Sequence, residues 1–257
     1  MSSVPLKQSI PFSQFDQLRG AREIIRQEAD ALNGVAKNLD TRFCEAVDLL
    51  EECRGRVVVT GIGKAGWIGQ QLTATLSSTG TRAQFLHPAE AVHGDLGGIG
   101  PDDVVLALSN SGETDEITRL IPVFQQFEIP IVAITRSAES TLGRQATVVV
   151  EIGRIPEAGE LGLAPSSTTT AMLAVGDALA LVVSRSKGFS ASDFGTFHPG
   201  GSLGKQLTPV RNVMRDGGEL RIADCRETIR STLQRLRSTG RRTGALLAVN
   251  PDGTLAG

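Results

Sequence analysis

The sequence predicts an α/β protein with a doubly wound, five-stranded parallel sheet that helices cover on both faces. Five short strand-like runs occur at 57–60, 83–86, 104–108, 131–135 and 147–152, and all but the second contain several β-branched residues. Helical stretches separate several of these runs, at 67–77, 113–127 and 166–186. Strands that are apolar throughout are typical of a parallel sheet buried on both sides. In such a sheet, ligands bind at the carboxyl ends of the strands.

Residues 1–55, before the sheet, are predicted to be an N-terminal helical extension. Its first 12 residues are expected to be a loose leader. Its apolar residues recur at helical spacing from Phe15 onward, and they need another surface to cover. Asn33-Gly34 is expected to divide this extension into two helices or to kink it. The sheet domain itself is assigned to residues 56–204.

Residues 205–257 differ in character from the sheet domain. An amphipathic stretch at 228–237 precedes an apolar run at 245–249 and a turn at 250–253. The chain ends just where a second hairpin strand would begin, and a lone strand leaves backbone donors and acceptors unmatched. We therefore expect this region to be the opening of a truncated second module.

The composition excludes several classes of function. A net charge of −2, with 40% hydrophobic and 21% charged residues, gives no general attraction to nucleic acid or to anionic membranes. Three cysteines without CxxC spacing argue against a disulfide framework or a thiolate zinc site. No uninterrupted apolar run approaches the roughly 20 residues that span a bilayer. These features predict a soluble, cytoplasmic protein with neither nucleic-acid nor membrane partners.

The first strand leads into a glycine loop that also carries a lysine, Gly61-Ile62-Gly63-Lys64-Ala65-Gly66. Its GxGxxG spacing is a weak signal for a dinucleotide, which would need an acidic residue after the second strand. That strand instead runs into His87-Pro88, and the loop does not match a P-loop either. We therefore expect no nicotinamide cofactor. A lysine in a tight loop at this edge of the sheet is a candidate functional residue.

Two hydroxyl-rich segments precede predicted helices. Their candidate binding residues are Ser109, Ser111 and Thr114 in the first segment and Ser166, Ser167 and Thr168 in the second. Hydroxyls beside a helix N-terminus suit an anionic ligand, although Ser and Thr before a helix often serve only as caps. Two such segments and the Gly–Lys loop, all at strand ends of one sheet, favour a bound anion such as a phosphate.

Four segments together carry a resemblance to a known family: 61–66, 109–114, 162–169 with its Gly-Leu-Ala-Pro motif, and 197–201 with its His-Pro-Gly-Gly turn. They resemble the arabinose-5-phosphate isomerases, in which tandem CBS domains follow a sugar isomerase (SIS) domain. The resemblance implies a flavodoxin-like strand order and a truncated CBS domain at 205–257. It also implies interconversion of D-arabinose 5-phosphate and D-ribulose 5-phosphate through an enediol, without a cofactor. The resemblance further implies that the reaction supplies the synthesis of 3-deoxy-D-manno-octulosonate, a sugar of lipopolysaccharide or capsule. It also implies that the chain assembles into a homo-tetramer.

The same resemblance assigns four catalytic residues: Lys64, Glu116, Glu157 and His198. Lys64 would balance the charge of the developing enediolate, and Glu157 would abstract the proton. Partial burial of Glu157 is expected to raise its pKa. Glu116 matches the family's catalytic position better than Glu113, which belongs to the phosphate loop. His198 would open the sugar ring and would reach the active site of a neighbouring subunit.

Further positions follow from the resemblance. His93, Gly80 and Thr81 are candidate substrate contacts, and His87 matches a position linked to an inhibitory zinc ion. One imidazole makes a poor metal site without additional ligands. Near Glu157, the Gly159-Glu160 pair departs from the Cys-Pro that some relatives carry.

The main alternative is a non-catalytic regulator that senses a sugar phosphate with the same domain. Such regulators carry a helix-turn-helix with a basic face, whereas residues 1–55 mix both signs of charge. A different reaction on the same fold, such as amino-sugar deamination or lactyl-ether cleavage, is a second alternative. The joint presence of the four catalytic matches and the His-Pro-Gly-Gly turn favours the isomerase.

Overall fold

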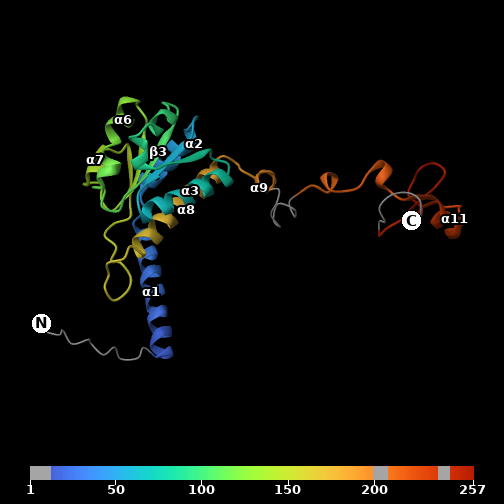
Figure 1. The fold of residues 1–257 in the computed structure, drawn as a ribbon, viewed down its shortest axis with the longest axis horizontal. Helices are drawn as coiled ribbons and strands as arrows, with labels where there is room; N and C mark the ends of the chain where they lie inside the picture. Colours follow the sequence, from blue (N-terminus) through green and yellow to red (C-terminus); the bar gives the residue numbers. More distant parts are fainter. Residues whose placement is uncertain (1–12, 199–207, 237–243) are drawn as a thin grey trace, which may run out of the picture. The chain divides into compact units, whose positions relative to one another are not determined.

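The computed structural model describes residues 13–198, 208–236 and 244–257. The chain forms two compact units, Met1–His198 and Pro199–Gly257, so the first unit ends six residues before the expected boundary at 204. The leader at 1–12 and the 199–201 part of the His-Pro-Gly-Gly turn lie outside the described residues. In the first unit, a sheet stands between two layers of helices (Figure 1).

The five predicted strands form one parallel sheet, and the predicted fold class is confirmed. The strands are β1 (Val57–Gly61), β2 (Ala83–Leu86), β3 (Val104–Leu108), β4 (Ile131–Thr135) and β5 (Val148–Glu151). Their order is β2-β1-β3-β4-β5, with every neighbouring pair parallel. The chain therefore changes direction across the sheet between β1 and β3. This is the topological switch point at which open α/β sheets bind ligands.

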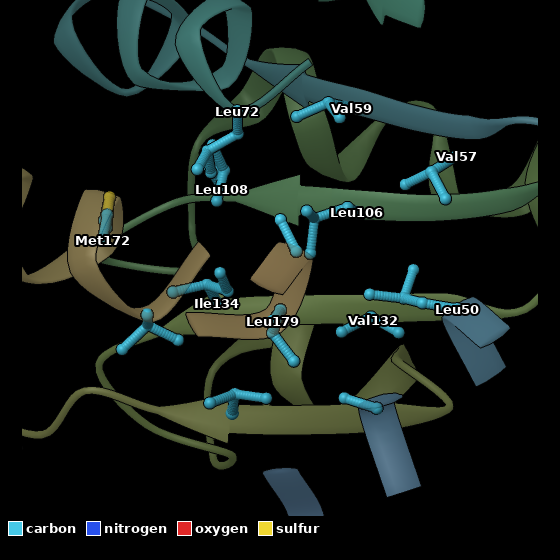
Figure 2. Close-up of a cluster of buried hydrophobic side chains, with 14 of the residues drawn as sticks. Leu50, Val57, Val59, Leu72, Leu106, Leu108, Val132, Ile134, Met172 and Leu179 are labelled. Atoms are coloured by element: carbon cyan, nitrogen blue, oxygen red, sulfur yellow. The ribbon is translucent and has the colours of Figure 1, made fainter. Parts of the chain in front are cut away.

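Alternate residues of each strand face opposite sides of the sheet, and this alternation builds two cores. One core packs Val57 and Val59 against leucines of the helices on the same side, such as Leu50, Leu72 and Leu179 (Figure 2). The other core contains the intervening strand residues and the helices of the opposite side. Burial on both faces explains why the central strands β1, β3 and β4 are largely apolar.

The helices divide between the two faces. The first face carries α1 (Gln14–Asn38), α2 (Thr41–Glu52), α3 (Lys64–Ser78) and α8 (Ser167–Ser186). The second carries α4 (Pro88–Ala91), α5 (Asp115–Thr118), α6 (Ile121–Gln126) and α7 (Thr141–Gln145), with the 3-10 turn η1 (Asp95–Gly98) between α4 and β3. Helices on both faces are the arrangement that doubly wound connections produce.

Two predicted helix boundaries were wrong. The helix α1 continues through Asn33-Gly34, and the break comes at Asp40, whose side chain accepts a hydrogen bond from Arg42 N at 2.9 Å and caps α2. An exposed glycine inside a long helix costs only about 1 kcal/mol, so it need not end the helix. The stretch at 113–127 forms two short helices, because Pro122 lies in the first turn of α6 and has no N–H to continue α5.

The long helix α8 lies at the centre of the first face. It is long and apolar enough to cross a membrane by length and composition, but 56% of that stretch is buried inside the unit. A helix that is apolar nearly all round is typical of a protein core. Gly176 allows α3 to approach closely, since a Cβ at this position would lie 2.2 Å from Cδ1 of the fully buried Leu72.

Gly176→Ala is therefore expected to lower the free energy of unfolding by about 1–3 kcal/mol, because the added methyl overpacks a closed core. Gly34→Ala is the matched control, since a Cβ at this helical glycine meets nothing within 4 Å. It should raise stability by about 1 kcal/mol through helix propensity. Urea denaturation of both variants measures the two effects, and equal changes would contradict the packing role of Gly176.

The second unit contains a small parallel β–α–β arrangement. The strands β6 (Ile222–Asp224) and β7 (Leu247–Val249) pair in parallel, and α11 (Ile229–Leu236) lies between them in sequence. The prediction of a lone strand was thus wrong, because β6 was not recognised in its short polar surroundings. Val249 also forms an antiparallel bridge to Leu255, where the second hairpin strand was expected. Two single-turn 3-10 helices, η2 (Val210–Asn212) and η3 (Gly217–Glu219), precede β6.

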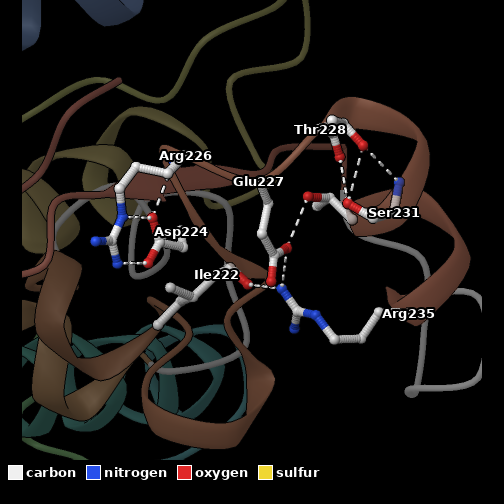
Figure 3. A network of polar contacts seen from close by, with 8 residues as sticks. Ile222, Asp224, Arg226, Glu227, Thr228, Ser231 and Arg235 are labelled. Carbon is white, nitrogen blue, oxygen red and sulfur yellow. Dashed lines mark hydrogen bonds and ion pairs between the residues drawn. The ribbon is translucent and has the colours of Figure 1, made fainter.

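Two charged pairs organise the connection from β6 to α11 (Figure 3). Arg226 donates Nε and Nη2 to the two oxygens of Asp224, which lowers the pKa of Asp224 to about 2. Glu227 accepts hydrogen bonds from Thr232 Oγ1 at 2.9 Å and from Arg235 Nη2 at 3.0 Å. These contacts fix the start of α11 relative to β6, and no predicted site residue lies among them.

Candidate active site

The glycine loop after β1 places Lys64 at the carboxyl edge of the sheet. Gly63 has φ of 60°, a left-handed conformation that favours glycine, and Lys64 is the first residue of α3. Its Nζ donates to the carbonyl oxygen of Pro165 at 3.3 Å, so the lysine reaches the segment before α8. The outer glycines of the motif serve packing, since a Cβ on Gly66 would lie 2.8 Å from the carbonyl oxygen of Gly61.

The loop after β3 is held in shape by its own hydroxyl groups. Ser109 Oγ lies 2.8 Å from Thr114 Oγ1 and accepts from Gly112 N at 3.0 Å. Ser111 Oγ accepts from Glu113 N at 3.1 Å. Gly112 has φ of 66°, and a Cβ there would collide with the side chain of Ser140. The loop's shape is thus fixed by hydrogen bonds among its own residues.

The two glutamates beside this loop have different surroundings. Glu113 Oε1 accepts from Thr141 N at 2.8 Å, and its hydrogen bonds to Thr141 lower its pKa. Its carboxylate therefore supports the start of α7. Glu116 lies on α5 with an exposed side chain. Neither glutamate lines the cavity described below, and the catalytic role of Glu116 stays a prediction.

The Glu157 carboxylate lies at the N-terminus of α8. Its Oε2 accepts from the backbone N of Ser166 at 2.8 Å and of Thr168 at 3.2 Å, and from Ser166 Oγ at 3.3 Å. Its Oε1 accepts from Thr168 Oγ1. Burial raises the pKa of Glu157, but the hydrogen bonds from Thr168 and Ser166 outweigh burial and leave the pKa below its ordinary value. The expected raised pKa was therefore wrong.

These contacts also change the interpretation of the second hydroxyl segment. Ser166 and Thr168 were expected to bind substrate, yet both donate to Glu157. Ser167 is fully buried, and its hydroxyl has no hydrogen-bond partner among the described residues. The segment thus binds an anion as predicted from its helix N-terminus, but that anion is a carboxylate of the same chain.

A cavity of about 420 Å³ lies between the three loops. Its lining includes five of the predicted residues, Lys64, Ser109, Ser111, Thr114 and Thr168. Asn110, Pro165 and Thr169 also line it and were not predicted, although each lies inside a segment that the sequence singled out. The cavity volume suits a small phosphorylated ligand. A larger cavity of about 530 Å³ lies beside β5 and α2, and none of its lining residues was a predicted site residue.

The histidines after β2 do not line this cavity. His87 caps α4, with Nδ1 accepting from Ala89 N at 3.3 Å, and His93 is exposed beyond that helix. Within the described ranges, no group of three or more His, Cys, Asp or Glu side chains is placed to hold a metal ion. The structure therefore gives the predicted zinc position at His87 no set of three such ligands within the described part of the same chain.

Gly80, Thr81 and His198 lie at the opposite edge of the sheet. Gly80 and Thr81 precede β2, and Thr81 is buried and accepts from Lys187 Nζ at 3.2 Å, just beyond the C-terminal end of α8. Phe189 covers Gly80 and stacks on Phe197 of α9 (Ala191–Phe197), the residue before His198. The 20 residues of α8 span about 30 Å and separate these residues from Glu157. One chain therefore does not bring them to the cavity.

Comparison with known proteins agrees with the geometry of the sheet and loops. Residues 49–182 match the SIS domain family, which defines the class of protein. Arabinose 5-phosphate isomerase KdsD of Shigella flexneri is 43% identical over 221 residues, covering 86% of this chain and 66% of that protein. KdsD of Francisella tularensis is 39% identical over 253 residues, covering 95% and 77%.

A solved structure of E. coli CFT073 c3406 in complex with A5P superposes with a TM-score of 0.71 at 41% identity, covering 73% of this chain and all of that one. The chain spans about two thirds of the length of the first of these relatives. It belongs to the arabinose 5-phosphate isomerase family, as the sequence motifs predicted.

Proposed function

We propose that the chain catalyses the interconversion of D-arabinose 5-phosphate and D-ribulose 5-phosphate. The observation that carries the proposal is the meeting of Lys64 and Glu157 at one turn. Lys64 Nζ contacts the carbonyl of Pro165, and the Glu157 carboxylate binds the N–H of the next residue, Ser166. Lys64 lines the hydroxyl-lined cavity, and Glu157, which does not line it, is bound to Thr168 in the cavity wall. The cation and the anionic base that proton transfer next to a carbonyl requires thus meet at one turn. The arabinose 5-phosphate isomerases among its relatives support the choice of substrate.

The proposed chemistry moves one proton between two carbons. Glu157 removes the proton from C2 of the open-chain aldose, and the electron pair moves toward the C1 carbonyl oxygen to give an enediolate. Lys64 balances the charge on that oxygen. Transfer of the O2 proton to O1 and return of the proton held by Glu157 to C1 then give the ketose. Glu116, exposed on the neighbouring helix α5, is proposed as a further catalytic carboxylate.

The phosphate is proposed to bind the loop after β3. The hydroxyls of Ser109, Ser111 and Thr114 border the cavity. Removing this phosphate from water is favourable only where such donors replace its hydration.

The active site is proposed to be completed by a second copy of the chain. His198, Gly80 and Thr81 share one edge of the sheet, and the cavity opens at the other. A homo-oligomer, for which the family suggests a tetramer, would bring one copy's His198 to the next copy's cavity, where it would open the sugar ring. We place the reaction in the cytoplasm, supplying 3-deoxy-D-manno-octulosonate synthesis, and assign the second unit to a CBS domain.

A coupled assay over several pentose and hexose phosphates tests the proposal. We expect conversion of arabinose 5-phosphate, with selectivity for five carbons and no loss after treatment with a chelator, because the proposed steps use side chains alone. Binding of a sugar phosphate without turnover would instead support a non-catalytic sensor. Turnover of a hexose phosphate in preference to pentoses would reject the substrate assignment.

A further inference from the structure

We propose that Thr168, assisted by Ser166, is a positioning residue that holds the Glu157 carboxylate in place, and that it is not a ligand of the substrate. The inference rests on the proposed function, because it concerns the base of that reaction. It gives Thr168 a role in the proton transfer although the residue never contacts the reacting carbons.

The contacts of Thr168 are directed at both oxygens of Glu157. Its backbone N donates to Oε2 at 3.2 Å, and its hydroxyl donates to Oε1. The Ser166 backbone N and Oγ donate to the same Oε2 at 2.8 and 3.3 Å, and Ser166 Oγ in turn accepts from Ala158 N at 3.0 Å. Four hydrogen bonds from one helical turn thus fix both the position and the plane of the carboxylate.

Proton counting argues against a phosphate contact for Thr168. A threonine hydroxyl carries one donor hydrogen, and here that hydrogen points at Glu157. The remaining lone pairs of Oγ1 can only accept, so they would repel the oxygens of a phosphate dianion. Thr168 is also only 2% exposed, although it borders the cavity.

The same contacts set the charge of the base. Glu157 is half-buried, and burial alone would raise its pKa, but the hydrogen bonds from Thr168 and Ser166 lower it on balance. The charged groups on the surrounding elements make other contacts: Lys64 binds the Pro165 carbonyl, and Glu28 of α1 accepts from Thr170 Oγ1 at 3.3 Å. Arg154 and Glu160 of the same loop are exposed. Glu157 is therefore ionised at neutral pH, which is the state that a base requires.

Thr168→Val removes the hydroxyl donor at nearly constant volume, and Thr168→Ser keeps it. In T168V, we expect the acid limb of the pH profile of kcat/KM to move to higher pH, because burial of Glu157 persists with fewer hydrogen bonds. We expect kcat to fall on the order of 10²-fold through loss of alignment, while KM changes less than about threefold. T168S should recover about tenfold or more of the lost kcat.

A direct titration separates this proposal from the proposed function. The carboxyl pKa of Glu157, followed by NMR in glutamate-labelled protein, should rise in T168V and return toward the wild-type value in T168S. An unchanged Glu157 pKa in folded T168V would overturn the positioning role, whatever reaction the protein catalyses. A rise in KM with unchanged kcat would instead make Thr168 a substrate ligand.

Absence of isomerase activity in the wild-type protein would overturn the proposed function, while the titration would still decide whether Thr168 controls Glu157. If T168V does not fold, Ser166→Ala removes the second hydroxyl donor from an only partly buried position. Its Glu157 pKa should rise by less than that expected for T168V, and a pKa that does not rise contradicts the proposal.

Discussion

Replacing Lys64 with alanine is expected to lower kcat on the order of 10²–10³-fold, with a much smaller effect on KM. The reason is that the ammonium group is proposed to act on charge that develops only in the transition state. The folded state should tolerate the change, since Lys64 is exposed at the first position of α3 and, within the described residues, its side chain makes one hydrogen bond, to the Pro165 carbonyl. Steady-state kinetics and thermal unfolding of the same preparation measure both effects.

Lys37→Ala serves as the matched control, because Lys37 is an exposed lysine in the last turn of α1. It should leave kcat unchanged. Lys64→Arg is a second informative variant, because a planar guanidinium preserves the charge but not the compact geometry of an ammonium group. We expect its kcat to lie between those of Lys64→Ala and the wild type. Wild-type kcat in Lys64→Ala would remove this residue from the mechanism.

The sheet could be predicted closely because its signal is local. The central strands β1, β3 and β4 are short runs of buried residues, such as Val57, Val58 and Val59, and burial on both faces keeps these runs largely apolar. The connections are less regular. The split between α5 and α6 depends on Pro122, and the continuation of α1 through Gly34 depends on the small cost of one exposed glycine.

The loops of the site were also predictable, because their residues must satisfy helix N-termini and tight turns locally. What the sequence could not supply was the partner of each donor. Ser166 and Thr168 are recognisable in the sequence as hydrogen-bond donors. Only the fold shows that Glu157, which lies nine residues before Ser166 and eleven before Thr168, accepts from both. The pKa of Glu157 is lowered because of these hydrogen bonds, whereas burial considered by itself predicted a raised pKa.

The position of His198 marks the limit of what a single chain explains. The family motif assigns it to catalysis, while α8 separates it from Glu157 by about 30 Å. If a second copy supplies this histidine, each complete site combines Lys64 of one chain with His198 of another. The two residues can then be tested as a pair.

Lys64→Ala and His198→Ala are each expected to be nearly inactive alone, whereas co-expressed mixed assemblies should regain about a quarter of the wild-type activity. Random pairing of two chain types gives the intact combination at about one site in four, since each residue is intact in half of the chains. Two affinity tags isolate the mixed assemblies, and the isomerase assay measures them.

The control pairs wild-type chains with the double variant that carries both substitutions. A site shared between chains predicts about one quarter of full activity here too, whereas a site formed within one chain predicts about one half, because every wild-type chain would then keep a complete site. Mixed assemblies of the two single variants that show no gain over either parent would place His198 and Lys64 in the same chain's site, or exclude His198 from the reaction.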